Sequence, residues 1–318
     1  MDKLENKKHG FIAIVGAPNA GKSTITNALL GQKLSIVSPK VQTTRNSIRA
    51  IVISQNTQII LIDTPGIFIP RDDKILERVI VKSAWQGLRE ANHICFVIDV
   101  SVGLNPENIR ILNDLKKENL AITVILNKID LVKKSKMLEI FAGLSSLEIT
   151  DIIPVSATQN DGIENLKNIL ATKCQNPDWI FDEEQITDAP MRFIASEITR
   201  EKLFLNLHKE LPYSISVKTD NYEIMANGNI KIHQTIFVLK DSQKSIIVGK
   251  NGSMIKKIGQ EARVDIADIA GTKVHLYLFV KVSKDWMRNV ENFEKLDLEK
   301  LPKEGEKKFI KKKNITKK

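Results

Sequence analysis

Residues 16 to 23, Gly-Ala-Pro-Asn-Ala-Gly-Lys-Ser, constrain this chain more than any other segment because they match the phosphate-binding pattern G-x-x-x-x-G-K-[ST]. The apolar run "FIAIV" before them predicts a strand, and "STITNALL" after them predicts a helix. Glycines at 16 and 21 let backbone N–H groups come close to phosphates, and a helix N-terminus adds a positive dipole end. The sequence therefore predicts a strand, loop and helix that bind a nucleoside triphosphate.

Two side chains of this loop have predicted chemical roles. We expect Lys22 to bridge the β and γ phosphates and the Ser23 hydroxyl to bind Mg²⁺, which is small and takes oxygen ligands. The other nucleotide-binding candidates in the loop are Gly16, Asn19, Ala20, Gly21 and Thr24.

The choice of base is predicted from "ILNKID", where Asn127, Lys128 and Asp130 follow an apolar run. The carboxylate of Asp130 can accept from the N1–H and the exocyclic amine of guanine, and adenine would leave it unpaired at a large cost. Asn127 would fix the loop, and the Lys128 stem would cover the base. In the later segment "VSATQ", backbone N–H groups near Ser156 and Ala157 are candidates for the guanine oxygen.

Two further segments are expected to sense the γ-phosphate. In "LIDTPGI", Asp63 is placed to orient Mg²⁺ through a water and Gly66 to offer its N–H. In "SPKVQTTRN", Thr43 or Thr44 would reach Mg²⁺, and we favour Thr44. The catalytic candidates are Lys22, Thr44, Asp63 and Gly66, and the metal candidates are Ser23, Thr44 and Asp63.

The fold class follows from the rhythm of apolar runs. Six short runs between residues 11 and 156, most of them separated by helical-length stretches, predict an α/β domain with a doubly wound, mostly parallel six-stranded sheet. The second and third runs are three residues apart, which is too short for a parallel crossover and predicts a hairpin. We expect this domain over 8–174, a linker over 175–189, a smaller α+β domain over 190–290 and a basic tail over 291–318.

The second domain contains another glycine loop, "VGKNGSMIKKIG". Only two residues separate Gly249 and Gly252, so it fits G-x-x-G rather than the first pattern, and in KH domains such a loop clamps a single-stranded nucleic acid backbone between two helices. A helix starting near Thr187 or Asp188, with an apolar stripe that includes Leu205, two strands before the loop and one after it are also expected. The candidate RNA-binding residues are Gly249, Lys250, Asn251, Gly252, Lys256, Lys257 and Arg263.

Charge is distributed unevenly. Lys and Arg number 22 against 21 Asp and Glu in residues 1–184, but 26 against 17 from residue 185 onward, so +9 of the net +10 lies in the second part. Such a basic part predicts an anionic partner, either nucleic acid or an acidic membrane surface. A membrane-surface regulatory GTPase whose basic part binds anionic lipid is therefore the alternative function, and liposome binding with and without residues 303–318 separates the two.

A third class, a GTPase attached to an RNA-modifying enzyme, fits the residues poorly. Cys95 and Cys174 have no C-x-x-C spacing, and the five histidines show no metal-site spacing. The cysteine usage, the short apolar run at the N-terminus and the lack of a membrane-length apolar run predict a cytosolic protein.

Residues 10–172 resemble the translation-factor-related GTPases, and the order of both glycine loops over residues 10–288 resembles the Era-type GTPases. The resemblance implies a GTPase joined to a type II KH domain that binds the 3′ end of small-subunit ribosomal RNA during ribosome assembly and is also found at the cytoplasmic membrane. Ile67 stands where many small GTPases have a glutamine that orients the attacking water, so we expect slow unaided hydrolysis. The resemblance implies instead a potassium ion that is bound with the help of Asn19 and supplies charge near the phosphates. The tail after Trp286 departs from the family pattern. We expect a monomer, since both predicted sites lie in one chain.

Overall fold

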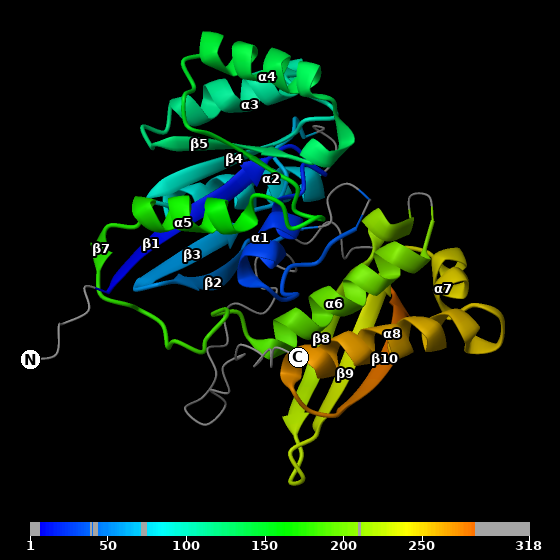
Figure 1. Ribbon diagram of the computed structural model, residues 1–318. Helices are drawn as coiled ribbons and strands as arrows, with labels where there is room; N and C mark the ends of the chain where they lie inside the picture. Colours follow the sequence, from blue (N-terminus) through cyan, green and yellow to red (C-terminus); the bar gives the residue numbers. More distant parts are fainter. Residues whose placement is uncertain (1–6, 39, 41–43, 71–74, 209–210, 284–318) are drawn as a thin grey trace, which may run out of the picture.

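Two β-sheets, formed one after the other along the chain, organise the molecule (Figure 1). The computed structural model describes residues 7–38, 40, 44–70, 75–208 and 211–283. Thr43, Trp286 and the predicted tail 291–318 lie outside these residues. No helix among the described residues is long and apolar enough to cross a membrane.

The first sheet is the predicted doubly wound one. Its strands are β1 (Lys8–Gly16), β2 (Ile48–Ser54), β3 (Thr57–Asp63), β4 (His93–Asp99), β5 (Ile122–Asn127), β6 (Ile152–Val155) and the short β7 (Asn176–Pro177). The order is β2-β3-β1-β4-β5-β6, with β7 beside the start of β1. β1, β3, β4, β5 and β6 are parallel, and β2 pairs with β3 antiparallel, which confirms the hairpin.

Helices cover both faces of this sheet (Figure 1). α1 (Lys22–Leu30) and α5 (Ile163–Lys173) pack on one face. α2 (Ile75–Arg89), α3 (Pro106–Lys116) and α4 (Lys134–Ser146) pack on the other. Because β1, β3, β4, β5 and β6 run parallel, their carboxyl ends meet at one edge of the sheet. Ligands bind at this edge in such folds.

The second sheet is small and mixed. Its order is β10-β9-β8, from β8 (Ser216–Ile224), β9 (Ile230–Val238) and β10 (Val274–Val282). β8 and β9 are antiparallel, whereas β9 and β10 are parallel and are joined by α7 (Asp241–Val248) and α8 (Ser253–Ala270). With the preceding α6 (Met191–Asn206), this α-β-β-α-α-β order is that of a type II KH domain.

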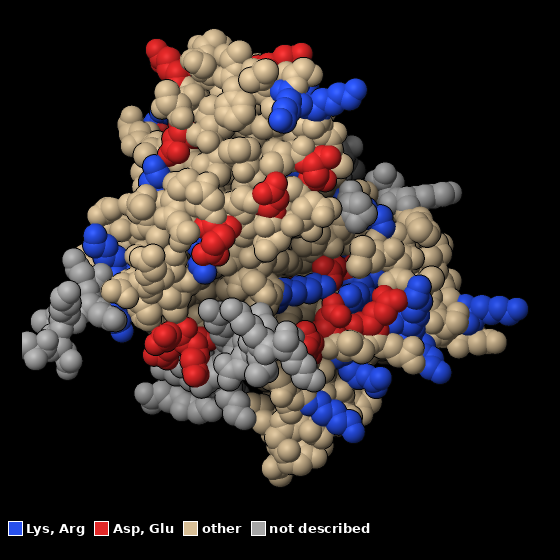
Figure 2. Space-filling view, in the orientation of Figure 1, with Lys and Arg blue, Asp and Glu red and all other residues tan. Residues whose placement is uncertain are grey.

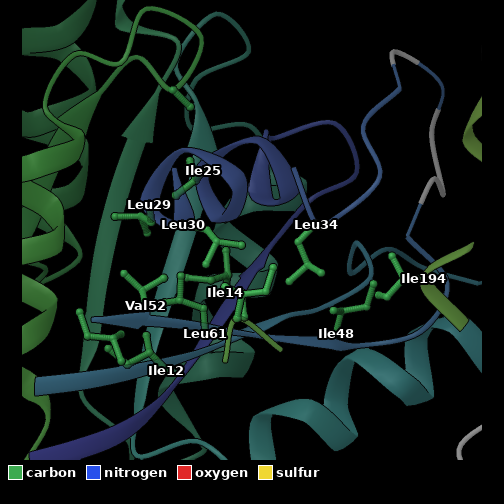
Figure 3. Close-up of a cluster of buried hydrophobic side chains, with 14 of the residues drawn as sticks. Ile12, Ile14, Ile25, Leu29, Leu30, Leu34, Ile48, Val52, Leu61 and Ile194 are labelled. Carbon is green, nitrogen blue, oxygen red and sulfur yellow. The ribbon is translucent and has the colours of Figure 1, made fainter. Parts of the chain in front are cut away.

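One apolar cluster extends across both halves of the molecule. It begins at β1 and α1 and continues through the first turns of α6 to β9 and α8. Figure 3 shows Ile194 of α6 beside Ile48 of β2 in this cluster, and both side chains are at most 2% exposed. The two sheets are thus joined through a packed interior as well as through the chain.

Three details differ from the sequence-based predictions. α6 begins at Met191 with Pro190 before it and no side-chain cap, because the Thr187 hydroxyl accepts from the N–H of Ala189 instead. Leu205 is 45% exposed, since the buried side of the last turn of α6 passes through Leu203 and Phe204. The two residues of β7 lie in the predicted linker, and they extend the first sheet to seven strands. The domain boundaries themselves stay a prediction.

Candidate nucleotide site and nucleic-acid interface

The first glycine loop connects β1 to α1 at the carboxyl edge of the sheet. Gly16 and Gly21 have φ values of +152° and +96°. A Cβ at Gly16 would lie 2.4 Å from the Val97 carbonyl oxygen, and one at Gly21 would lie 2.1 Å from the Asn127 side-chain nitrogen. Side chains at these positions would therefore push the loop away from its neighbours, which explains glycine at both.

Lys22 is held inside the predicted phosphate loop. Its Nζ donates to the carbonyl oxygens of Gly16 at 3.2 Å and Ala17 at 2.8 Å, and the residue is 6% exposed. Burial lowers the pKa of Lys22 to about 8, although the nearby Asp63 carboxylate raises it. A buried ammonium group in this position is suited to a strongly anionic ligand such as a polyphosphate.

The predicted metal ligands come together at the start of α1. The Ser23 hydroxyl lies 3.0 Å from the Thr44 hydroxyl, and Asp63 at the end of β3 is fully buried. Burial raises the pKa of Asp63, whereas hydrogen bonding from the Ser35 and Ser23 hydroxyls and the charge of Lys22 lower it. Neither carboxylate oxygen of Asp63 has a hydrogen-bond partner of good geometry among the described residues. An orphaned carboxylate beside two hydroxyls is a set of oxygens that fits Mg²⁺.

Gly66 approaches the same loop from β3. A Cβ there would lie 2.9 Å from Pro18, so only glycine allows this approach. The N–H of the next residue, Ile67, donates to the Gly16 carbonyl at 3.0 Å, and the Ile67 side chain is 1% exposed within the core on the α2 face. The position that often holds a water-orienting glutamine is therefore turned into the protein interior.

The predicted base-binding residues form a connected unit. Asn127 donates to the Ala20 carbonyl at 2.9 Å and accepts from the Ala157 N–H at 3.2 Å, so it ties the phosphate loop to the loop after β6. Asp130 accepts from the Ser156 hydroxyl at 2.5 Å. The structure thus brings together two sequence segments whose contacting residues are 26 and 30 positions apart.

Asp99 is a residue of this site that the sequence analysis missed. It ends β4 and accepts from Lys128 Nζ at 2.6 Å, while the same Nζ donates to the Asn19 carbonyl at 2.9 Å. Burial opposes ionisation of Asp99, but hydrogen bonds from Lys128 and Ser101 outweigh it and lower its pKa. The sequence does carry a signal for Asp99, because an acidic residue at the end of a buried strand lies at the edge where the other candidates lie.

The second glycine loop lies between α7 and α8. Gly249 has φ +73° and a Cβ there would lie 2.7 Å from Met254 Cβ, whereas a Cβ at Gly252, with φ +76°, would meet nothing. Asn251 also has positive φ, at 51°. The Lys250 and Asn251 side chains are exposed at the tip. The open side at Gly252 leaves room for a backbone to approach.

Basic side chains continue from this loop along α8. Lys256, Lys257 and Arg263 are exposed, and Figure 2 shows Lys and Arg side chains projecting over the α7 and α8 part of the molecule. Lys257 also lies 3.8 Å from Glu261, so part of its charge is compensated locally. Exposed apolar side chains accompany the basic ones, with Ile246 of α7 at 56% and Val264 of α8 at 63% exposure.

The segment that carries Thr44 is attached to the second half of the molecule. The buried guanidinium of Arg45 donates to the carbonyl oxygens of Ile215 at 2.7 Å and Tyr213 at 3.2 Å. Lys33 pairs with Glu201 of α6 and, at 2.7 Å, with Asp265 of α8. The predicted γ-phosphate sensor and the KH fold are therefore in direct contact.

Two family models match the chain in the order of its two sheets. A model described as "50S ribosome-binding GTPase" matches residues 11–128, and one described as "KH domain" matches residues 210–287. The first match includes the phosphate loop and Asn127, and the second includes the G-x-x-G loop.

Relatives and solved structures cover nearly the whole chain. GTPase Era of Afipia carboxidovorans is 45% identical over 296 residues, 93% of this chain and 95% of its own. GTPase Era of Agrobacterium fabrum is 45% identical over 293 residues, 92% of each. The crystal structure of Era with MgGDPNP and nucleotides 1506–1542 of 16S ribosomal RNA has a TM-score of 0.87 at 36% identity, covering 92% and 99% of the two chains. A variant of Aquifex aeolicus Era bound to GDP and AlF4⁻ gives 0.87 at 37% identity, covering 91% and 99%. On this similarity, which extends over both the nucleotide site and the G-x-x-G loop, the chain belongs to the Era family of GTPases.

Proposed function

We propose that this GTPase uses Mg²⁺ and GTP to control binding of the 3′ end of small-subunit ribosomal RNA and thereby assists assembly of the small subunit. In this proposal Lys22, Ser23, Thr44, Asp63 and Gly66 hold the phosphates and the metal, and the 127–130 and 156–157 segments hold guanine. The Era structure that contains MgGDPNP and 16S ribosomal RNA supports the choice of both ligands.

One observation carries the idea of control. The segment 33–45 contains Thr44, next to Ser23, and also the residues that contact α6, α8 and the carbonyl groups of 213 and 215. A γ-phosphate and its metal order such a segment, and hydrolysis releases it. The nucleotide state would then change the contacts between the two halves and, with them, the affinity for RNA. The free energy by which GTP strengthens RNA binding would equal the free energy by which RNA strengthens GTP binding.

The test is binding of a labelled RNA with the sequence of the 3′ end of small-subunit ribosomal RNA, beside a scrambled RNA, with a GTP analogue and with GDP. We expect selective binding that the GTP analogue strengthens. The double variant Lys250→Asp and Asn251→Asp should abolish it, because both side chains are exposed at the loop tip and the change repels phosphate. Lys218→Asp with Lys273→Asp, also exposed in the same domain, is the control. Equal RNA affinity in both nucleotide states would contradict the proposed control.

Potassium belongs to the same proposal. The residue after Gly66 is Ile67, a buried apolar side chain that cannot orient a water as a glutamine would. A monovalent cation held with the help of Asn19 would instead supply positive charge beside the phosphates. Hydrolysis should then be faster in potassium than in sodium buffer, and replacement of Asn19 by Ala should remove the difference. Equal rates in the two buffers with the wild-type chain would refute the potassium site.

We further infer a monomer in the cytoplasm with peripheral association at the inner face of the membrane through the basic tail. Co-sedimentation with anionic liposomes, with and without residues 303–318, tests the membrane part. Loss of liposome binding without the tail is expected, and unchanged binding would contradict it.

A further inference from the structure

The side chain of Gln243, in the first turn of α7, joins two segments that lie far apart in the sequence. Its Oε1 accepts from the N–H groups of Leu239 at 2.8 Å and Lys240 at 3.1 Å, and its Nε2 donates to the Ser214 hydroxyl at 2.9 Å. Glutamine at the third helical position often accepts from the N–H before a helix, but that role does not use the second bond. Gln243 therefore connects α7 to the 3-10 turn η2 (Leu211–Ser214) as well as capping the helix.

The turn η2 is attached to the first segment that we expect to sense the γ-phosphate. Arg45 directly follows Thr44, and its buried guanidinium donates to the carbonyl oxygens of Tyr213 at 3.2 Å and Ile215 at 2.7 Å. These two carbonyl groups flank Ser214, the partner of Gln243. A displacement of Thr44 toward a bound metal would therefore act on the backbone on both sides of Ser214.

Leu239, on the other side of Gln243, is attached to the second such segment. It directly follows β9 and packs in a small apolar cluster with Phe68, Leu76 and Ile80. Phe68 lies two residues after the glycine that we expect to meet the γ-phosphate, and Leu76 and Ile80 belong to α2. Both segments that would respond to GTP thus contact a residue to which the side chain of Gln243 is bonded, or the backbone beside it.

The helix α7 has few other attachments to the interior. Of its eight residues, all of which the structure describes, Ile247 is the one that is fully buried. The helix ends at Gly249, the first glycine of the G-x-x-G loop, where a Cβ would lie 2.7 Å from Met254 Cβ at the start of α8. Because the loop packs this closely on α8, its shape depends on where α7 is held.

We propose that Gln243 is the positioning residue through which the nucleotide state sets the G-x-x-G loop. With GTP bound, the ordered segments hold Ser214 and Leu239 where Gln243 bridges them, and α7 is fixed with the loop in the shape that binds RNA. When hydrolysis releases these segments, the bridge no longer constrains α7 and RNA is bound more weakly. The inference rests on the proposed control of RNA binding by GTP and identifies the residue that transmits it.

The test is the ratio of RNA affinity with a GTP analogue to that with GDP, measured with the labelled 3′-end RNA. We expect a ratio of about tenfold for the wild-type chain, as is usual for two coupled sites. Ser214→Ala removes the acceptor of the Gln243 amide but keeps the cap of α7, and should lower the ratio to about threefold or less. Gln243→Ala should lower it further, and Ser214→Thr, which keeps the hydroxyl, should stay near wild type.

Two further measurements separate coupling from a loss of structure. Without RNA, nucleotide affinity should stay within about twofold of wild type in each variant, because neither residue is among those proposed to bind nucleotide. Hydrogen exchange of the amides of residues 244–252, again without RNA, should be slower with the GTP analogue than with GDP in the wild-type chain. Ser214→Ala and Gln243→Ala should remove this difference.

Thr219→Val is the matched control. It removes a fully buried hydroxyl of the same domain that accepts from the Gln234 amide at 3.3 Å, which is the same kind of hydrogen bond. This change should lower the free energy of unfolding and leave the affinity ratio unchanged. A fall in the ratio as large as that of Ser214→Ala would show general loosening of the domain and would overturn the role of Gln243.

The outcomes distinguish this role from the function on which it rests. A wild-type ratio near one would refute the control of RNA binding by GTP, and the role of Gln243 with it. A large wild-type ratio that persists in Ser214→Ala and Gln243→Ala would refute the role of Gln243 alone. The same conclusion would follow if Ser214→Thr lost as much coupling as Ser214→Ala, or if exchange in residues 244–252 did not depend on the nucleotide.

Discussion

At the scale of single residues, Asp130 is the residue that we propose discriminates between guanine and adenine. Its carboxylate accepts from Ser156 at 2.5 Å, and the loop of Ser156 and Ala157 is in turn tied to Asn127. A carboxylate that is already positioned loses little conformational freedom when it pairs with a base, which favours selective binding.

Replacement of Asp130 by Asn should lower GTP affinity by about a hundredfold or more, because two hydrogen bonds to a charged group are lost and an amide donor faces the guanine amine. A base with a carbonyl in place of that amine, as in xanthosine triphosphate, should bind the variant better than GTP. Titration calorimetry with both nucleotides measures this. Asp114→Asn is the control, because Asp114 of α3 pairs with Arg110 of the same helix and with Lys117 directly after it. Unchanged preference for GTP would show that the base is read elsewhere.

At the scale of elements, a partly buried chain of polar side chains starts on β4 and β5, at the sheet edge opposite the nucleotide site. His93 lies 2.8 Å from the Thr123 hydroxyl, which donates to Asp151 at 2.7 Å, and Lys173 pairs with the same carboxylate. Burial and the charge of Lys173 lower the pKa of His93 to about 4, although Asp151 raises it. A histidine in this state is neutral in the folded chain at physiological pH.

This low pKa predicts a specific loss of stability in mild acid. The unfolded chain binds a proton at His93 near pH 6.5 and the folded chain only near pH 4, so protonation of the unfolded state lowers the free energy of unfolding as pH falls between these values. Thermal unfolding at pH 7 and pH 5 should show a larger drop in Tm for wild type than for His93→Gln. The same drop in both proteins would assign the acid sensitivity to other groups.

The attachment of Arg45 to the second half is a further property of elements. Arg45→Ala leaves the carbonyl groups of Tyr213 and Ile215 without their buried donor and should lower the free energy of unfolding by about 1–3 kcal/mol. Chemical denaturation measures the loss, with Lys117→Ala, an exposed partner of Asp114, as a control expected to change it by less than about 0.5 kcal/mol. Equal stability of the two variants would show that the contact adds nothing.

The elements of the fold were largely predictable, and the contacts between the halves were not. Continuous apolar runs in the sequence located β1 to β6, because strands that are buried on both faces of a sheet are apolar along most of their length. The candidate residues were then found directly after these runs. The contacts of Arg45 and Glu201 join groups that are more than 150 residues apart in the sequence, and no local pattern records them. The same reason explains Leu205, whose exposure depends on where the core ends rather than on helical spacing.

At the scale of the whole molecule, positive charge is concentrated in the half that contains the G-x-x-G loop. If Lys256 and Lys257 contact phosphates, replacing both by Gln should weaken RNA binding across sequences and reduce the slope of log affinity against log salt by about 1.4, at about 0.7 per phosphate contact on a single strand. Binding measured at four salt concentrations gives the slope, and Lys218→Gln with Lys273→Gln is the control. A slope equal to that of wild type would place these lysines away from the RNA.

The parallel pairing of β9 and β10 has a consequence for the order in which the protein becomes competent during its synthesis. Since α7, the G-x-x-G loop and α8 form the crossover between these strands, the loop is fixed only after β10, which ends at Val282, has been made. The residues that we propose bind nucleotide are all present by Ala157, and domains fold in turn from the N-terminus as a chain emerges. A newly made chain is thus able to take up nucleotide well before it is able to hold RNA.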